Sequence, residues 1–257
     1  MCYQIGLKLW STNTGAYLRE AQDLFNDGVY DYIELYIVPN TLHTLSLWEK
    51  QGIPYIIHNP HSMHGFNLAD ASKKESNRLI FQQVQQFADT LKAPYIIFHG
   101  GKDGTIEETI TQLLSLHEPR ALIENLPVYP LPNSPAKQCR GATLDELKLV
   151  KNEIHCGFCL DFGHAVCSAN AQGKKPYYFL QELLRLEPKM FHLSDLKNIH
   201  SFYDSHLHLG KGTLDIATLK HRFLPSNARI SIETEKSFPE TLHDFVEDVL
   251  YFKQLCS

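Results

Sequence analysis

Six short apolar runs in this sequence each end on a residue that can bind a metal ion. The runs end in turn at His58, His99, Glu124, Asp161, His192 and Glu233. Imidazole and carboxylate groups are ligands that zinc and related divalent ions use in proteins. One polar residue at the end of a strand is common, but six endings drawn from this set indicate a metal centre.

Three further candidates lie outside these endings. His164 follows Asp161 by three residues, and Asp204-Ser205-His206 places a carboxylate and an imidazole two residues apart, ahead of Gly210 and Gly212. The candidate ligands are therefore His58, His99, Glu124, Asp161, His164, His192, Asp204, His206 and Glu233. One zinc ion takes about four ligands, so this set favours a cluster of up to three ions, with Glu124 as a shared bridge. We also expect Glu124 and Glu233 to take part in catalysis.

The elements that would position these residues alternate along the chain. Apolar runs typical of buried strands are followed by segments whose apolar residues repeat at helical spacing. The predicted strands cover residues 3–9, 31–37, 55–58, 95–99, 120–125, 157–161, 189–194 and 229–233. The predicted helices lie within 17–25, 40–51, 80–91, 105–117, from about 143 onward, 175–186, 215–223 and 239–255. Thr143, with Glu146 three residues later, is typical of a capping box.

Eight strands that alternate with eight helices over 257 residues predict an α/β fold, a single (β/α)8 TIM barrel that spans residues 1–257. A doubly wound open sheet is the alternative fold with the same alternation. The candidate ligands favour the barrel, because the carboxyl ends of the third to eighth strands converge only if they surround a common mouth.

The composition is that of an ordinary globular chain, with 43% hydrophobic residues, 21% charged residues and a formal charge of -5. No global basic field indicates nucleic acid, although a local patch would suffice. The apolar runs are far shorter than the roughly 20 residues that span a bilayer, and the first residues do not resemble a signal peptide. We therefore expect a cytoplasmic protein with reduced cysteines, in which Cys156 and Cys159 are structural.

The motifs around the candidate ligands resemble those of the type IV apurinic/apyrimidinic endonucleases, which belong to the xylose isomerase-like barrel superfamily. The motifs are Phe98-His99-Gly100-Gly101, Ile123-Glu124-Asn125, Cys159-Leu160-Asp161-Phe162-Gly163-His164, His192-Leu193-Ser194-Asp195-Leu196-Lys197, Asp204-Ser205-His206 with Leu209-Gly210-Lys211-Gly212, and Ile232-Glu233-Thr234. The resemblance spans nearly the whole chain, and all nine ligand positions of that family are filled in order.

The resemblance implies how the ligands are shared among the metals. One zinc ion would bind His58, His99 and Glu124; a second Glu124, Asp161, His192 and Glu233; and a third His164, Asp204 and His206. Manganese and iron are the alternative metals. The implied reaction is phosphodiester hydrolysis by a hydroxide that bridges the metals. The implied partner is damaged DNA or another phosphodiester. We expect a monomer that does not associate with membranes.

The sequence also differs from the endonuclease pattern. After the second strand, that family carries an arginine-bearing loop that penetrates DNA. The matching residues here are 36–41, and the chain has no Arg or Lys from there until Lys50. His61 and Ser205 stand where the family has tyrosine and arginine. Glu34, expected at the end of the second strand, is more like the sugar isomerases and epimerases of the superfamily. Those enzymes use a single divalent metal on the positions of Glu124, Asp161, His192 and Glu233.

Two alternatives to the hydrolase therefore stay open. The first is a metal-dependent sugar isomerase or epimerase, and the second, less favoured, is a barrel that binds metal without turnover. Three residues near the motifs have two interpretations each. His61 and His208 either support the ligands or lie apart from them, and Asp195 either orients a ligand or closes its loop.

Overall fold

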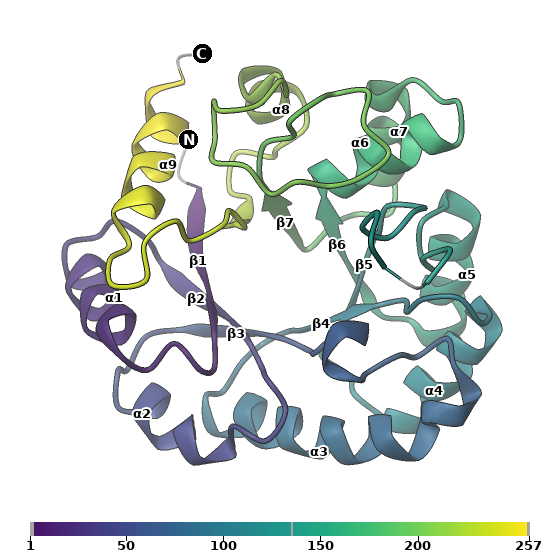
Figure 1. Cartoon of the computed structure of the whole chain (residues 1–257), viewed down its shortest axis with the longest axis horizontal. Helices are drawn as coiled ribbons and strands as arrows, with labels where there is room; N and C mark the ends of the chain where they lie inside the picture. Colours follow the sequence, from purple (N-terminus) through teal and green to yellow (C-terminus); the bar gives the residue numbers. More distant parts are fainter. Residues whose placement is uncertain (1–2, 135, 256–257) are drawn as a thin grey trace.

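The computed structural model of the protein describes residues 3–134 and 136–255. Eight parallel strands form a closed barrel in chain order, with helices around it (Figure 1). The strands are β1 Gln4–Trp10, β2 Tyr32–Tyr36, β3 Tyr55–His58, β4 Ile96–His99, β5 Ala121–Glu124, β6 Gly157–Asp161, β7 Met190–Leu193 and β8 Arg229–Ile232. Strand β1 pairs with both β2 and β8, which closes the sheet. The predicted (β/α)8 barrel is confirmed, and the open doubly wound sheet is wrong.

Nine α-helices lie in the described parts of the chain. They are α1 Ala16–Asn26, α2 Leu45–Glu49, α3 Lys74–Thr90, α4 Ile106–Leu116, α5 Leu144–Ile154, α6 Phe162–Ala171, α7 Pro176–Leu184, α8 Ile216–Arg222 and α9 His243–Gln254. Short 3-10 turns cover Leu42–Thr44, Ser62–His64 and Ala71–Lys73. The predicted helix over 40–51 is in fact a 3-10 turn followed by the five-residue α2. Helix α5 begins with the predicted capping box of Thr143 and Glu146.

The sequence analysis missed helix α6, which begins directly after β6. Eight of its ten residues are buried, from Phe162 to Ala169. A helix that is buried on nearly all sides has no polar face, so its sequence lacks the helical alternation of apolar and polar residues. Because of α6, two helices instead of one connect β6 to β7, and His164 lies in the first turn of a helix.

The lower part of the barrel interior is filled by an apolar layer. Its members are Tyr32, Ile56, Ile97, Leu122, Cys159 and Met190, one from each of β2 to β7. In β1 the matching position is Gly6, where a Cβ atom would lie 2.3 Å from the ring of Tyr32. Side chains of a strand alternate between its two faces, so the residue two positions further along each strand also faces inward. The apolar layer thus supports a second inward layer at the carboxyl ends of the strands.

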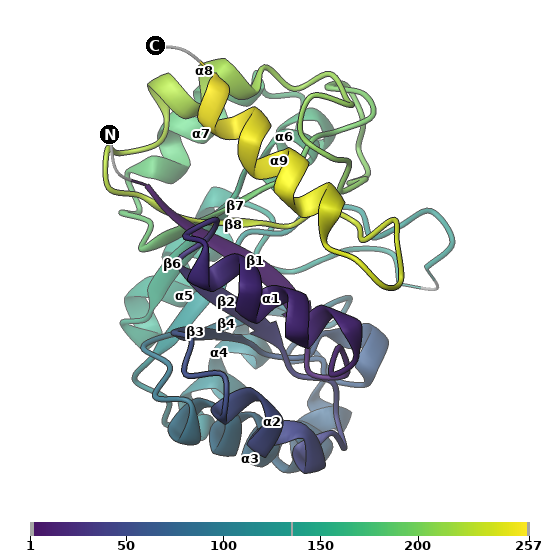
Figure 2. The ribbon, with the colours of Figure 1, turned by 90° about the vertical axis from the view of Figure 1, so that its left-hand side faces the viewer.

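The connections at the carboxyl ends of the strands gather at one end of the barrel. In the side view, the loop between β5 and α5 and the loop between β8 and α9 project beyond the strands at this end (Figure 2). Because the active sites of (β/α)8 barrels are built from such loops, this end is where a functional site is expected.

Four of the six cysteines lie in the described part of the chain. Cys139, Cys156, Cys159 and Cys167 are free thiols, whereas Cys2 and Cys256 lie outside the described residues. Cys159 belongs to the apolar layer, so it has a structural role. Among the residues described, no helix is both long and apolar enough to cross a bilayer.

Candidate metal centre

The second inward layer of the barrel is polar throughout. It consists of Lys8, Glu34, His58, His99, Glu124, Asp161, His192 and Glu233, one residue from each strand or its end. Six of these side chains are buried; His99 and Glu233 are partly exposed. Three more polar residues join the layer from outside the strands, His164 from α6 and Asp204 and His206 from the loop between β7 and α8. On each strand, the polar residue of this layer lies two positions after the inward residue of the layer below it, so both face the barrel interior.

The structure gathers all nine predicted ligands into three groups. The first group is His58, His99 and Glu124; the second is Glu124, Asp161, His192 and Glu233; the third is His164, Asp204 and His206. Within each group the possible ligand atoms lie within 4.8 Å of one another. These groups coincide with the three sets that the endonuclease resemblance implies. That the residues bind metal, and which metal, stays a prediction.

Glu124 contacts imidazoles on two sides with different oxygens. Its Oε2 lies 3.2 Å from His58 Nε2 and 3.1 Å from His99 Nε2. Its Oε1 lies 3.2 Å from His164 Nδ1 and 3.3 Å from His192 Nδ1. A carboxylate whose two oxygens face different sets of ligands has the geometry of a bridge between two metal ions.

Asp204 has a similar central place in the third group. Its Oδ2 lies 2.7 Å from His206 Nε2 and 3.3 Å from His164 Nε2. Helix α6 positions His164, because Asp161 Oδ1 accepts a hydrogen bond from the His164 backbone N–H at 2.6 Å and so caps the helix. The first turn of α6 thus connects the second group to the third.

Backbone carbonyls determine which ring nitrogen of two histidines is available to a metal. His58 Nδ1 lies 2.8 Å from the Asn59 carbonyl oxygen, and His206 Nδ1 lies 2.9 Å from the Glu233 carbonyl oxygen. A carbonyl oxygen only accepts, so Nδ1 donates, and a neutral ring then carries its lone pair on Nε2. In both rings Nε2 faces a carboxylate of the same group.

In His192 the roles of the two nitrogens are reversed. Nε2 lies 2.9 Å from Glu34 Oε2 and donates to it, so the lone pair of a neutral ring lies on Nδ1. That Nδ1 lies 2.8 Å from Glu233 Oε2, 3.3 Å from Glu124 Oε1 and 3.9 Å from Asp161 Oδ2. Lone pairs that face one another at these distances repel unless a proton or a cation lies between them. A divalent cation in the second group would relieve this repulsion.

The hydrogen-bonding state of the groups also fits a bound cation. Of ten buried side-chain atoms that lack a hydrogen bond of normal geometry in the described part of the chain, five are possible ligand atoms: Glu124 Oε1, Asp161 Oδ2, His192 Nδ1, Asp204 Oδ2 and Glu233 Oε2. Buried polar atoms are rarely left unpaired, and a buried carboxylate without a partner costs free energy. Each of these atoms belongs to one of the three groups. The imidazole nitrogens and carboxylate oxygens suit zinc, and they also suit manganese or iron.

Burial and neighbouring charges shift the pKa values of several side chains in the centre. Burial raises the pKa of Asp161 to about 6. Burial lowers the pKa of His99 to about 4, although Glu124 opposes this effect. Burial also disfavours the charged ring of His206, but the charge of Asp204 outweighs it and raises the pKa of His206 to about 9. The pKa of each of these groups is therefore set jointly by its burial and by the charges of its neighbours in the centre.

Lys8 was missed in the sequence analysis. Its Nζ lies 2.6 Å from Glu34 Oε1 and 2.9 Å from Glu233 Oε1, and it is almost fully buried. A single lysine between Leu7 and Leu9 in a predicted strand was the signal that could have indicated it. Glu34 is not at the end of its strand as predicted but in the middle of β2, because the staggered register of the barrel aligns it with Lys8.

The structure decides between the two interpretations of His61, His208 and Asp195. The ring of His61 stacks on that of His99, with centroids 5.4 Å apart and an interplanar angle of 9°, so His61 supports a predicted ligand. His208 Nδ1 instead lies 2.8 Å from a carboxylate of α9, away from the three groups. Asp195 accepts hydrogen bonds from backbone amides within residues 210–214, so it closes its loop.

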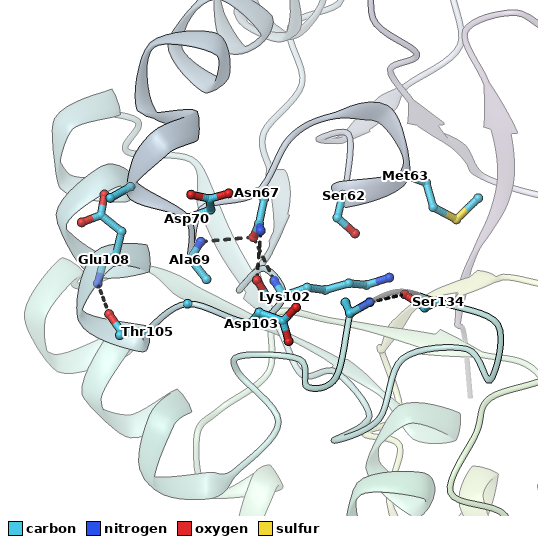
Figure 3. Close-up of a pocket in the computed structure, with 13 residues that line it drawn as sticks. Ser62, Met63, Asn67, Ala69, Asp70, Lys102, Asp103, Thr105, Glu108 and Ser134 are labelled. Carbon is cyan, nitrogen blue, oxygen red and sulfur yellow. Dashed lines mark hydrogen bonds between the residues drawn. The ribbon is translucent and has the colours of Figure 1, made fainter.

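Members of all three groups lie on the floor of a cleft with a volume of about 900 Å³: His58, His99, His164, Asp204, His206 and Glu233. Its walls include Trp10, Tyr36, Met63 and Tyr129. A second cavity of about 630 Å³ shares Met63 and Lys102 with the first (Figure 3). The candidate metal centre is thus reached through an open cleft with a side pocket.

Fold and site together define a (β/α)8 barrel protein with a cluster of possible metal ligands at the carboxyl ends of its strands, where enzymes of this fold carry their active sites. The sequence model of the xylose isomerase-like TIM barrel family matches residues 30–254. The chain therefore belongs to this family.

Solved structures of similar fold include an epimerase-like protein and two endonucleases. A D-tagatose 3-epimerase-like protein is 18% identical with a TM-score of 0.72, covering 98% of this chain and 96% of the other. Endonuclease IV from Thermus thermophilus is 21% identical with a TM-score of 0.69, covering 98% of both chains. An AP endonuclease of family 2 from Brucella melitensis is 14% identical with a TM-score of 0.66, covering 97% and 98%.

At these identities the similarity shows the fold and does not select between the reactions. No curated protein is detectably similar to the chain in sequence. The choice between an endonuclease-like and an epimerase-like reaction therefore depends on the residues of the centre.

Proposed function

We propose that the protein is a zinc-dependent phosphodiester hydrolase with a cluster of up to three metal ions, resembling the type IV apurinic/apyrimidinic endonucleases. The observation that carries this proposal is the position of Glu124, whose two oxygens face different sets of histidines. A single-metal reaction requires only the second group. It gives no reason for placing the histidines of the first group beside Glu124, or for a third group around Asp204.

Metal ions bound to these groups would activate water and neutralise the charge of a phosphate. In the reaction, the oxygen of a water molecule bonds to phosphorus, one ester P–O bond breaks, and a proton reaches the leaving oxygen. The products are a phosphomonoester and an alcohol. Among the carboxylates, Glu124 is buried, whereas the Glu233 side chain is 20% exposed and lines the cleft, so a substrate can reach it. Glu233 Oε2 faces His192 in the second group. Lys8 holds the other oxygen of Glu233.

Two ligand substitutions test the proposal. His58→Ala and His99→Ala each remove a ligand of the first group and leave the second group intact. We expect hydrolysis of bis(p-nitrophenyl) phosphate by the zinc-loaded protein to fall by roughly 100-fold or more in both variants. His243→Ala, which changes an exposed histidine of α9, is the matched control. Wild-type rates in both ligand variants would refute the proposal.

A sugar isomerase or epimerase is the second candidate, and the buried pair of Lys8 and Glu34 favours it. Both side chains lie beside the second group, which is the set that single-metal members of the superfamily are expected to use. The same two variants separate the candidates, because an isomerase activity that survives loss of His58 and His99 needs only the second group. A barrel without catalytic activity is the least favoured alternative. A monomeric state and a cytoplasmic location stay predictions.

A further inference from the structure

The cleft above the candidate metal centre carries aromatic side chains on opposite sides. Trp10 is the last residue of β1 and is 42% exposed; Tyr129 lies in the loop after β5 and is 40% exposed. Both residues line the cleft. Trp10 packs against Tyr36 of β2, whereas Tyr129 packs on the loop between β7 and α8, so the two rings lie on different sides of the cleft.

Each of these rings is held by other rings and still keeps exposed surface. Trp10 packs against Tyr36 with ring centroids 5.3 Å apart, and it forms a T-shaped contact with His64 at a centroid distance of 5.6 Å. Tyr129 has Phe202 at 6.2 Å and Tyr203 at 6.5 Å, both from the loop between β7 and α8. Aromatic side chains that neighbours have already ordered lose little entropy when a ligand stacks on them.

The same cleft offers little positive charge to a nucleic acid backbone. Its described lining contains three lysines, Lys8, Lys102 and Lys236, and no arginine. Lys8 is paired with two carboxylates, and Lys236 Nζ donates to a backbone carbonyl two residues away. Lys102 remains as the cation for a phosphate. Lys102 lines both the cleft and the side pocket, and its side chain extends between Ser62 and Ser134 (Figure 3).

These features disfavour a duplex and favour unstacked rings. A duplex is bound mainly through many contacts of Lys and Arg to its phosphates, which this cleft does not provide. The bases of a duplex are also stacked on each other, whereas aromatic side chains bind bases that are free to stack on protein. Two aromatic walls with a phosphate-binding floor therefore suit a short, single-stranded ligand.

We infer that the substrate is a dinucleotide-sized phosphodiester that carries a planar ring on each side of the scissile phosphate. This inference rests on the proposed hydrolase function. The phosphate lies on the floor near Glu233, one ring stacks on Trp10, the other stacks on Tyr129, and Lys102 faces a phosphate oxygen that does not react. Water adds its oxygen to phosphorus, the ester bond on one side breaks, and the leaving oxygen takes a proton. A dinucleotide then gives a nucleotide and a nucleoside.

Binding tests the ring contacts without catalysis. The chain has two tryptophans, and Trp48 is fully buried, so quenching by a ligand reports on Trp10. We expect thymidylyl-(3′→5′)-thymidine to quench the fluorescence and dimethyl phosphate to have no effect. Tyr129→Leu should weaken dinucleotide binding roughly tenfold, while Tyr178→Leu, an exposed tyrosine of α7, should not. Equal affinity for both ligands, or no effect of Tyr129→Leu, would overturn the inference.

Kinetics separates this inference from the proposed function. Thymidine 5′-(p-nitrophenyl) phosphate and methyl p-nitrophenyl phosphate share a leaving group and differ only in the second substituent. We expect the thymidine ester to have a kcat/KM at least about tenfold higher, and Tyr129→Leu to remove most of this preference. Cleavage of both esters with equal kcat/KM keeps the hydrolase and overturns the ring contacts. Cleavage of neither ester overturns the hydrolase, and the fluorescence titration still decides ring binding.

Discussion

Glu34 Oε2 lies 2.9 Å from His192 Nε2, and both side chains are completely buried inside the barrel. The carboxylate can only accept, so it fixes the proton on Nε2 and turns Nδ1 toward the second group. Pairs of this kind orient metal-binding histidines and raise their basicity. The other oxygen of Glu34 lies 2.6 Å from Lys8 Nζ, which balances its charge. Glu34 is therefore expected to act on the metal through His192 and not as a ligand.

Glu34→Gln tests this role. The substitution removes the charge that pairs with Lys8 and polarises His192, while the side chain keeps its size. We expect the affinity of the second group for zinc to fall roughly 10- to 100-fold, measured by competition with a chelator of known affinity. Glu118→Gln, which changes a buried carboxylate outside the centre, is the control. Equal zinc affinities for wild type and Glu34→Gln would show that Glu34 does not support His192.

The pair of Glu118 and Arg120 predicts a pH-dependent contribution to stability. Arg120 Nε and Nη2 donate to the Glu118 carboxylate at 2.6 Å and 2.8 Å. Burial opposes ionisation, but these hydrogen bonds outweigh it and lower the pKa of Glu118 below its usual 4.5. A carboxyl whose pKa is depressed by folding stabilises the protein above its ordinary pKa, and this stabilisation is lost as the pH falls through the lowered value.

Glu118→Gln should therefore lower the free energy of unfolding at neutral pH by about 1 kcal/mol. The difference from wild type should disappear in acid, where Glu118 of the wild type is protonated. Urea denaturation at neutral pH and well below the ordinary carboxyl pKa measures it. A difference that is the same in both conditions would mean that the charge of Glu118 contributes nothing.

Incision of duplex DNA at abasic sites is expected to be slow and poorly selective. Residues 37–49 contain neither Arg nor Lys, so the loop after β2 offers no cation to a DNA backbone. The assay compares a duplex with one abasic analogue, an undamaged duplex and a chromogenic phosphodiester, all with zinc-loaded protein. Tight, strongly selective incision at the abasic site would contradict this prediction and assign recognition to other loops, such as residues 59–67.

Much of the candidate site could be predicted from the sequence because strand ends are local features. His58 and His99 each close a short apolar run, and the barrel adds only that the ends of all such runs meet at one mouth. The bridging position of Glu124 depends on distances between β3, β4, β6 and β7, which no local pattern contains. The sequence suggests this bridge from the number of candidate ligands, with Glu124 among them, and from the resemblance to a known family.

The features that were missed have physical reasons. Helix α6 has no polar face because the helix is buried on nearly all sides, so the pattern that identifies surface helices is absent. Lys8 was overlooked because a lysine in a strand usually faces solvent, and its partners Glu34 and Glu233 are distant in sequence. The tautomers of the histidines depend on carbonyls such as that of Asn59, which only the folded backbone places.

The metal content of the purified protein tests the central claim most directly. Elemental analysis of the full chain is expected to give about two to three equivalents of zinc, or zinc with manganese or iron, per chain. His206→Ala, which removes a ligand of the third group, should lower the content by about one equivalent, while His243→Ala should leave it unchanged. One metal ion or none in the wild-type protein would contradict the multi-metal hydrolase, and it would favour the isomerase or the barrel without catalytic activity.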